Sequence, residues 1–213
     1  MTNTPQQVAL VANGLIEDHD FIASLIKKYA FVVAVDGGLL HCEKMHIKPD
    51  LIIGDLDSVP TDILKNYPNT PTKKFPKEKD ETDLELALLA VKDQFSSMAL
   101  FATLGHRLDH TLYNLHLLRR YSKNAVIESE RETIFCIQGK TQVATTPGQT
   151  ISFIPLGAPV VNVSSRGLKW ELKQATFNKD FMSISNICLG DAVTLEIGEG
   201  DLLCCLHRND NKN

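Results

Sequence analysis

The segment Leu51-Ile52-Ile53-Gly54-Asp55-Leu56-Asp57-Ser58 decides the fold of the first half of the chain. Its three aliphatic residues are typical of a short buried strand, and Gly54 marks the point where that strand ends. Because alternate side chains of an extended chain point the same way, Asp55 and Asp57 are expected to converge just past the strand. Open α/β sheets bind ligands at this carboxyl edge. Converging carboxylates favour a bound Mg²⁺, and two solvated loop acids are the alternative.

Short apolar runs alternate with helical patterns on both sides of this segment, up to about residue 123. Predicted strands cover residues 8–11, 31–35, 51–53 and 98–104, and predicted helices cover residues 21–29, 83–93 and 108–121. In the last helix, the residues predicted to face the core are Leu108, Leu112, Leu115 and Leu118. Strands that alternate with helices indicate parallel βαβ units. The first half is therefore predicted to be an α/β domain with a mainly parallel sheet.

The pattern changes from about residue 125, where helical periodicity fades. Strand-like runs separated by glycines and prolines cover residues 133–137, 149–154, 160–163, 168–172, 192–197 and 202–206. Several short strands at this spacing are typical of a small sandwich or barrel. We predict two domains, an α/β domain over residues 1–123 and an all-β sandwich over residues 124–213.

Bulk composition narrows the possible functions. The chain has 213 residues, 43% of them hydrophobic, and a net charge of −4, which argues against broad affinity for nucleic acid or an acidic membrane. No apolar stretch approaches the roughly 18 residues needed to span a bilayer. Five cysteines without a Cys-x-x-Cys spacing argue against a disulfide framework or zinc site, so a reducing cytoplasm is expected.

A second acidic segment runs from Lys79 to Glu85. Thr82 and Glu85 have the spacing of a capping box, so a helix is predicted to begin here. Asp80 and Asp83 would then project toward the same edge as Asp55 and Asp57, and the four could hold one or two Mg²⁺ ions. Acids that merely complement the helix dipole are the alternative. Four lysines nearby could balance polyphosphate charge or simply be solvated: Lys73, Lys74, Lys77 and Lys79.

A third segment, Leu104-Gly105-His106-Arg107-Leu108-Asp109-His110, links a predicted strand to a helix, a position that favours anions. Arg107 offers a fork of donors to phosphate, and Asp109 could orient a hydroxyl or a ring nitrogen. The histidines of this region lack the spaced partners of a zinc site. The turns Asn13-Gly14 and Asp36-Gly37-Gly38 are weak signals by themselves, and the chain has no Walker A or Gly-x-Gly-x-x-Gly sequence.

Taken together, these segments resemble the thiamin pyrophosphokinase family. The matching pieces, in the family's order, are Asp36-Gly37-Gly38, Pro49-Asp50 running to Ser58, Lys79 to Asp83, Leu104 to His110, Gly167-Leu168-Lys169-Trp170, and Ser185-Asn186. They span about residues 8 to 206. The family pattern often has a second Gly where His106 stands, and no catalytic role is carried onto Asp50.

The resemblance implies an ATP-binding α/β domain followed by a β-sandwich, assembled as a homodimer with active sites between subunits. It implies transfer of a diphosphate from ATP to the hydroxyl of thiamin, with AMP as the other product. Catalytic residues would be Asp55, Asp57, Asp80, Asp83, Arg107 and Asp109, with Mg²⁺ held by the first four. Nucleotide contacts would come from Asn13, Asp36, Gly37, Gly38, Thr82 and Arg107. Thiamin contacts would come from Asp109, Trp170, Ser185 and Asn186.

Several alternatives remain open at the level of sequence. The chain could act on another hydroxymethyl heterocycle, such as a pterin, or be a non-catalytic thiamin or nucleotide sensor. A nucleotidyl-sugar transferase would explain Asp-x-Asp but not the second half. Trp170 is either a platform for thiamin, held by cation–π attraction, or a core residue. The general base for the thiamin hydroxyl is Asp83 or Asp109.

Overall fold

The computed structural model describes residues 7–121 and 125–209, and its chain divides into two compact units. Of the described residues, the first unit holds those up to Leu117 together with 125–130. The second unit holds Leu118 to Tyr121 and everything from Arg131 onward. The predicted domain boundary between residues 123 and 124 lies outside the described residues.

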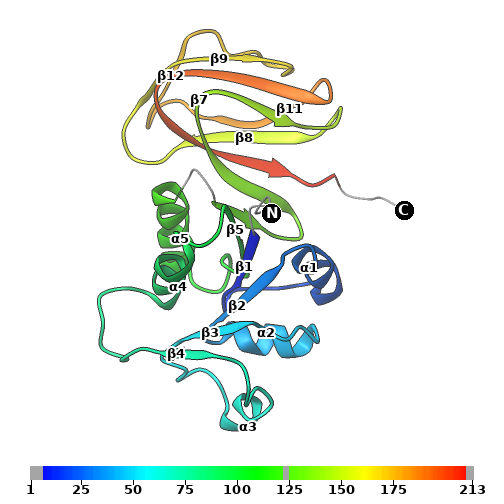
Figure 1. Ribbon diagram of the computed structural model, residues 1–213. Coiled ribbons are helices and arrows are strands. Elements are labelled where there is room, and N and C mark those ends of the chain that lie inside the picture. Colours follow the sequence, from blue (N-terminus) through cyan, green and yellow to red (C-terminus); the bar gives the residue numbers. More distant parts are fainter. Residues whose placement is uncertain (1–6, 122–124, 210–213) are drawn as a thin grey trace, which may run out of the picture. The chain divides into compact units, whose positions relative to one another are not determined.

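The first unit is built on a parallel sheet with the strand order β4-β3-β2-β1-β5-β6 (Figure 1). The strands are β1 (Gln7–Val11), β2 (Phe31–Val35), β3 (Leu51–Gly54), β4 (Thr72–Lys74), β5 (Ser97–Phe101) and β6 (Ala125–Glu128). Every neighbouring pair among them is parallel, as predicted. The chain moves outward on one side of β1 through β2 to β4, and on the other side through β5 to β6. The carboxyl end between β1 and β5 is therefore a switch point, where ligands bind in such sheets.

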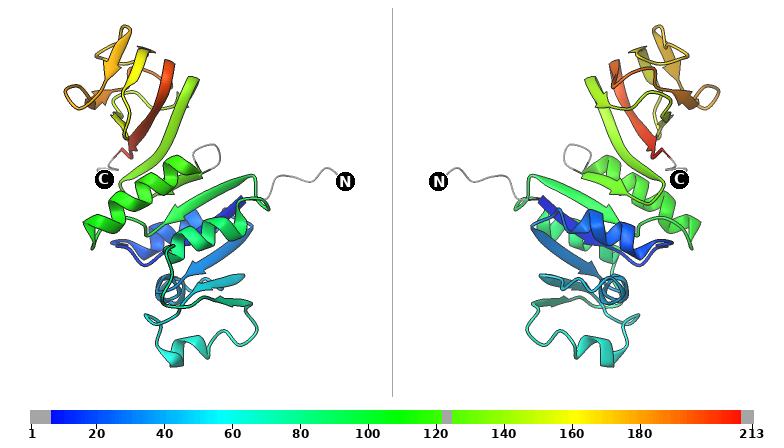
Figure 2. Two further views of the ribbon diagram at one scale, coloured as in Figure 1. Left: turned by 90° about the vertical axis from the view of Figure 1, so that its left-hand side faces the viewer. Right: turned by 90° about the vertical axis from the view of Figure 1, so that its right-hand side faces the viewer.

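Helices cover both faces of this sheet (Figure 2). They are α1 (His19–Ile26), α2 (Gly38–Lys44), α3 (Thr61–Leu64), α4 (Asp83–Val91) and α5 (Leu108–Arg120). Alternate residues of β1 face opposite sides, yet Val8, Ala9, Leu10 and Val11 are all fully buried. Ala9 and Val11 pack in one core cluster with residues of α1 and α2. Helix α4 contacts strands β1, β2 and β3. Burial on both faces explains why these strands are continuous aliphatic runs.

Three details of the first unit differ from the sequence prediction. The predicted core-facing side of α5 is only partly right: Leu118 is buried as predicted, but Leu108 and Leu112 are exposed. Asn114 and Leu117, which were not predicted to face the core, are buried. Asn114 Nδ2 donates a hydrogen bond to the carbonyl of Thr103 (2.7 Å), which fixes the rotation of the helix. Strand β5 ends at Phe101 rather than residue 104, and the short elements α2, α3 and β4 were not predicted.

The second unit is all β and its strand pairs are antiparallel. Its strands are β7 (Glu132–Ala144), β8 (Thr150–Pro155), β9 (Val160–Arg166), β10 (Ala175–Phe177), β11 (Ser183–Ile187) and β12 (Ala192–His207). The two strands predicted over 192–206 are one long strand, β12, whose register breaks between Glu196 and Asp201. The first part of β12 pairs with β9 and the second part with β8, and Gly200 (φ 96°) supplies the bend.

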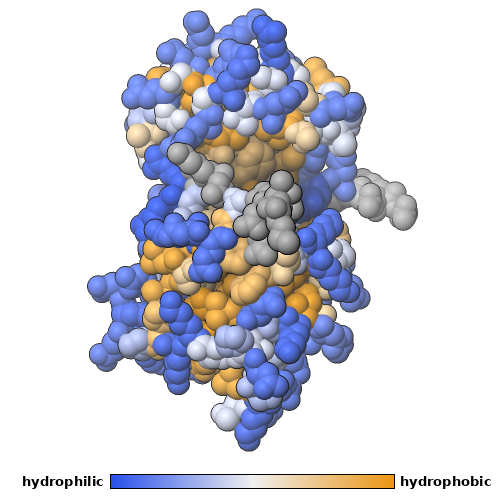
Figure 3. Space-filling model, viewed as in Figure 1, coloured by the Kyte–Doolittle hydropathy of each residue, from blue (hydrophilic) through white to orange (hydrophobic). Residues whose placement is uncertain are grey.

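The core of the second unit brings β8 together with β9 and β10, which pair with each other but not with β8. Phe153 of β8, Val163 of β9 and Phe177 of β10 are fully buried in one cluster. The predicted strand at 168–172 is wrong, because this stretch is irregular apart from one bridge between Leu168 and Cys188. Hydrophilic residues surround hydrophobic ones on each unit in the view of Figure 3. None of the helices in the described ranges has the length and apolarity needed to cross a membrane.

Candidate functional site

A cleft of about 430 Å³ opens at the carboxyl edge of the parallel sheet. Its lining comes from the loops after β1, β2, β3 and β5 and from the start of α4, which are far apart in the sequence (Figure 1). Residues from the predicted site that line it are Asn13, Asp36, Asp55, Thr82, Asp83 and Arg107. The carboxyl ends of parallel strands lie at the same edge of a sheet, so this topology brings the separate acidic segments together.

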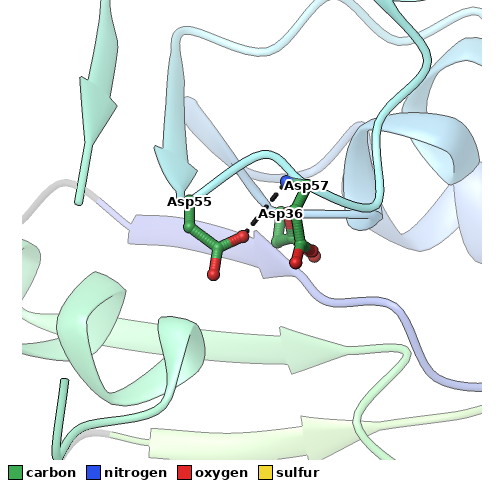
Figure 4. Close-up of side chains that lie close together, drawn as sticks. All are labelled: Asp36, Asp55 and Asp57. Atoms are coloured by element: carbon green, nitrogen blue, oxygen red, sulfur yellow. Dashed lines mark hydrogen bonds between the residues drawn. The ribbon is translucent and has the colours of Figure 1, made fainter. Parts of the chain in front are cut away.

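Three carboxylates gather on one side of the cleft and form what we call the acidic floor: Asp36, Asp55 and Asp57, each with one oxygen within 4.8 Å of the others (Figure 4). Asp36 and Asp55 line the cleft, and Asp57 is exposed beside it. Asp57 N donates a hydrogen bond to Asp55 Oδ1 (3.1 Å), which closes the turn between the two acids. Asp36 Oδ1 is buried without a hydrogen-bond partner among the described residues. A buried carboxylate oxygen without a donor, beside two further carboxylates, fits a hard divalent cation such as Mg²⁺.

Backbone strain concentrates around this floor. Asp36 (φ 46°), Leu56 (φ 63°) and Ala102 (φ 52°) all have left-handed backbone conformations directly after β2, β3 and β5. Such conformations cost on the order of 1 kcal/mol each for residues other than glycine and cluster at functional sites. Gly38 is needed for a different reason, because a Cβ there would lie 1.9 Å from the carbonyl oxygen of Val11. Gly37 and Gly38 thus allow α2 to start against the cleft.

Lys79 reaches into the cleft from the loop before α4. Its ammonium lies 3.0 Å from Asp83 Oδ1 and 3.4 Å from Asp55 Oδ2, and its side chain is only 12% exposed. Burial by itself would lower the pKa of Lys79, but the hydrogen bond and charge of Asp83, with Asp55, raise it above the ordinary value. The pKa of Asp83 is also raised, because burial and the charges of Asp36 and Asp55 outweigh the effect of Lys79.

The start of α4 follows the predicted capping pattern. Thr82 Oγ1 accepts a hydrogen bond from Glu85 N (3.2 Å), so the helix begins at Asp83 and directs that carboxylate into the cleft. The carboxylate of Glu85 accepts a hydrogen bond from the Tyr113 hydroxyl (2.6 Å) on α5. Asp80 is exposed and is not among the residues that line the cleft. Its predicted role as a metal ligand stays a prediction.

Arg107 and Asp109 form a bidentate ion pair at the rim of the cleft. Arg107 Nε and Nη2 donate to the two carboxylate oxygens of Asp109 at 3.2 and 2.6 Å, and both side chains are exposed. The hydrogen bond from Arg107 lowers the pKa of Asp109 to about 2. The preceding residue, His106, has φ 48°, a conformation that favours glycine. The loop therefore adopts the glycine-like backbone despite the histidine.

The second unit carries its own candidate site around Trp170. This side chain is 56% exposed, so it is not a core residue. It borders a pocket of about 270 Å³ together with Phe181, Met182, Ile184 and Asn186, and its indole is covered by the ammonium of Lys169 at 4.8 Å. Ser185 is exposed beside this pocket, and its backbone (φ 57°) is held by a hydrogen bond to Ser152 Oγ (2.9 Å).

Comparison with known proteins finds a match for each half of the chain. A model of the thiamin pyrophosphokinase catalytic domain matches residues 22–128, and a model of the thiamin pyrophosphokinase vitamin B1 binding domain matches residues 132–202. The chain belongs to the thiamin pyrophosphokinase family. The two matched segments meet where the parallel sheet ends and the antiparallel strands begin.

Curated relatives in this family include thiamine pyrophosphokinases 1 and 2 of Arabidopsis thaliana, each 30% identical over 172 residues. The alignments cover 73% of this chain and 64% of each relative, so the chain spans about two thirds of their length or slightly less. Solved thiamin pyrophosphokinases share the fold. The Bacillus subtilis structure has a TM-score of 0.83 at 22% identity, over 96% of this chain and 100% of that one. The yeast structure has a TM-score of 0.83 at 17% identity, over 97% and 87%.

The structure also places Asp36 and Lys79 in positions that were not predicted from the sequence. Asp36 was predicted as a nucleotide contact, and the structure places its carboxylate beside Asp55 and Asp57. Lys79 was treated as one of four loop lysines, and its burial between two carboxylates has no signal in the sequence. Asp50 lies at the opposite end of β3, where Oδ2 accepts from Val32 N (2.8 Å). Its position there agrees with leaving it out of the catalytic set.

Proposed function

We propose that this protein is a thiamine diphosphokinase, which transfers a diphosphate from ATP to the hydroxyl of thiamin and releases AMP. The observation that carries the proposal is the cluster of Asp36, Asp55 and Asp57 at the ligand-binding edge of the sheet, in a chain of this family. Attack at the β-phosphorus leaves little covalent chemistry to the protein, so positioning and charge dominate catalysis. The acidic floor, held on a strained backbone, suits the positioning of phosphates and the stabilisation of their charge.

Nucleotide binding is assigned to the first unit, over the proposed domain 1–123. The acids of the cleft would hold Mg²⁺, which supplies charge neutralisation and alignment of the phosphates when bound. Asn13, Gly37, Gly38 and Thr82 shape the nucleotide side through backbone and short polar side chains. Arg107 is exposed, so it can exchange the carboxylate of Asp109 for a phosphate at small cost.

The thiamin hydroxyl must give up its proton to a base, and the two candidates for this base are Asp83 and Asp109. While Arg107 pairs with it, Asp109 is a weak base, because that hydrogen bond lowers the pKa of Asp109 to about 2 and a catalytic base works best with a pKa closer to the working pH. When Arg107 turns to phosphate, Asp109 loses this partner and can accept a hydrogen bond or the proton from the thiamin hydroxyl. Asp83 and Asp109 are therefore both candidates for receiving the proton.

Thiamin binding is assigned to the second unit, within the proposed β-sandwich domain 124–213. An exposed indole provides a face for the positively charged thiazolium or the pyrimidine, and such cation–π contacts are worth about 1–2 kcal/mol when desolvated. Ser185 and Asn186 offer hydrogen bonds beside it. We propose a homodimer in which the Trp170 pocket of one subunit serves the acidic cleft of the other. We also propose that the enzyme is cytoplasmic.

The decisive experiment identifies the nucleotide product. Protein, MgATP and thiamin are incubated together, and the products are separated by ion-exchange chromatography. The proposal requires AMP and thiamin diphosphate in equal amounts. Release of ADP would reject the proposal and show transfer of a single phosphoryl group. No turnover despite binding of both ligands would reject it in favour of a sensor. Replacing thiamin by a hydroxymethylpterin in a parallel reaction tests the other diphosphokinase.

A further inference from the structure

The position of Lys79 is unusual for a lysine in a surface loop. Its side chain is 12% exposed, whereas the neighbouring Lys77, which pairs with Asp57 at the mouth of the cleft, is 77% exposed. A lysine is rarely buried unless its charge is paired. Here the ammonium is held by two carboxylates from different parts of the fold, Asp55 after β3 and Asp83 at the start of α4, and by the carbonyl of Pro76 (3.1 Å).

This arrangement does two things at once. It joins the loop after β3 to the start of α4 across the cleft, through Asp55 and Asp83. It also places an ammonium within ion-pair distance of one carboxylate oxygen on each of two acids that are candidates for binding Mg²⁺. An ammonium and a divalent cation compete for the same oxygens, because both need the negative charge of the carboxylates.

We infer that Lys79 is the resident cation of the cleft: it holds Asp55 and Asp83 together in the ligand-free protein and transfers its ammonium to the polyphosphate when nucleotide and divalent ion bind. The inference rests on the proposed function, since it names a phosphate-binding residue for that reaction. The four-carbon stem of lysine makes such a movement possible without a change in the backbone. Both partners of the ammonium line the same cleft as the proposed phosphate site.

Opposite effects on two ligands distinguish this role from simple packing. Without Lys79, free Mn²⁺ no longer competes with an ammonium, so it should bind the acids more tightly. The nucleotide loses a cationic partner, so MgATP should bind more weakly. A residue needed only for folding would weaken both ligands together.

The test uses the full chain and no thiamin. Lys79→Gln should bind Mn²⁺, followed by electron paramagnetic resonance of the free ion, at least about fivefold more tightly than wild type. The same variant should bind MgATP, followed by calorimetry, about 10- to 100-fold more weakly, as expected for a lost charge-assisted contact. Lys79→Arg should stay within about threefold of wild type for MgATP, since it keeps the charge.

A further variant separates position from charge. Lys65→Gln removes an exposed lysine outside the cleft lining and should change either affinity less than about threefold, because solvent screens its charge. If Lys79→Gln does not fold by circular dichroism, Lys79→Met keeps the apolar stem and takes its place.

Three outcomes would overturn the inference: unchanged affinities for both ligands, a parallel loss of both, or equal effects of Lys65→Gln and Lys79→Gln. The comparison of variant with wild type reports on Lys79, whereas the wild-type protein by itself reports on the proposed function. Wild-type protein that binds MgATP but makes no AMP would reject the diphosphokinase proposal and leave the Lys79 result standing.

Discussion

Asn186 holds the backbone of Trp170 on both sides: its Oδ1 accepts a hydrogen bond from Trp170 N (3.2 Å) and its Nδ2 donates one to Trp170 O (2.8 Å). Asn186 is 2% exposed, whereas Trp170 is 56% exposed. A buried amide thus anchors an exposed indole on an irregular stretch of chain. Ser185-Asn186 begins 15 residues after Trp170 in the sequence, and Asn186 positions the aromatic ring.

Asn186→Ala is expected to lower the free energy of unfolding by about 1–3 kcal/mol, because it leaves the backbone groups of Trp170 without their buried partners. The KM for thiamin should rise by roughly tenfold, with the KM for ATP unchanged. Urea denaturation and initial rates measure the two effects. Asn186→Asp is the matched variant, since it keeps the acceptor for Trp170 N and loses only the donor. A rise in both KM values would show that Asn186 acts on the whole fold.

Trp170→Ala is expected to change stability little, because a half-exposed indole leaves no large cavity. A fully buried tryptophan would instead cost about 3–5 kcal/mol. Thiamin affinity should weaken by about 5- to 30-fold through loss of the cation–π contact. A melting curve beside separate titrations with thiamin and ATP provides the measurement, and Trp170→Phe should retain part of the affinity. A large fall in melting temperature with loss of both ligands would contradict the platform role.

Asp57→Asn is expected to reduce turnover by on the order of 10²-fold or more, because one charge is lost from the acidic floor where phosphate charge must be stabilised. The fold should persist, since Asp57 is exposed and only Lys77 and Ser58 bind its carboxylate among the described residues. Asp62→Asn on the exposed helix α3 controls for net charge. Near-normal turnover of Asp57→Asn with native circular dichroism would exclude Asp57 from the metal site.

The acidic edge could be predicted from sequence because parallel strands place their carboxyl ends together. Once residues 51–53 were read as a buried strand, the position of Asp55 at this edge followed from topology. The rotation of α5 could not be predicted. Leu108 and Leu112 have the spacing of a buried face, but the hydrogen bond from Asn114 to Thr103 selects a different face, and such a bond depends on tertiary structure.

An irregular stretch of backbone is the second feature that could not be predicted from the sequence. Residues 168–172 have the apolar content of a strand, yet the side chain of Glu171 accepts hydrogen bonds from Gly167 N (2.8 Å) and Leu168 N (3.2 Å) and folds the segment into a loop. Local bonds of this kind compete with strand pairing. The same loop exposes Trp170, which explains why sequence alone left its burial open. Lys79 is a similar case, because nothing local distinguishes it from Lys77.

His41 is expected to make stability depend on pH. Its Nε2 lies 2.8 Å from the carbonyl oxygen of Gly14, and its Nδ1 lies 3.1 Å from His19 Nε2. Burial lowers the pKa of His41, and the nearby charges of His19, Lys44 and His106 add to this effect. The folded protein resists protonation at this ring while the unfolded chain takes up the proton. The stabilisation is therefore present above the unfolded pKa of about 6.5 and is lost as the pH falls.

Urea denaturation at pH 7, 6 and 5 tests this dependence. His41→Gln should lose less stability than wild type between pH 7 and 5, since it removes one group that must stay neutral in the folded state. His116→Gln, on the exposed side of α5, should keep the wild-type slope. Equal slopes for all three proteins would assign the pH dependence to other groups.

Mixing two inactive chains tests the proposed sharing of sites between subunits. In Asp57→Asn the acidic floor is damaged, and in Trp170→Ala the platform is lost, so each homodimer should be impaired. Random exchange between equal amounts makes about half of the dimers mixed, and each mixed dimer keeps one intact site if Trp170 serves the partner's cleft. About a quarter of the sites should then recover wild-type turnover at saturating MgATP and low thiamin. Subunit exchange is verified separately with differently tagged chains. Proven exchange without recovery would place Trp170 and the acidic floor in the site of one and the same subunit.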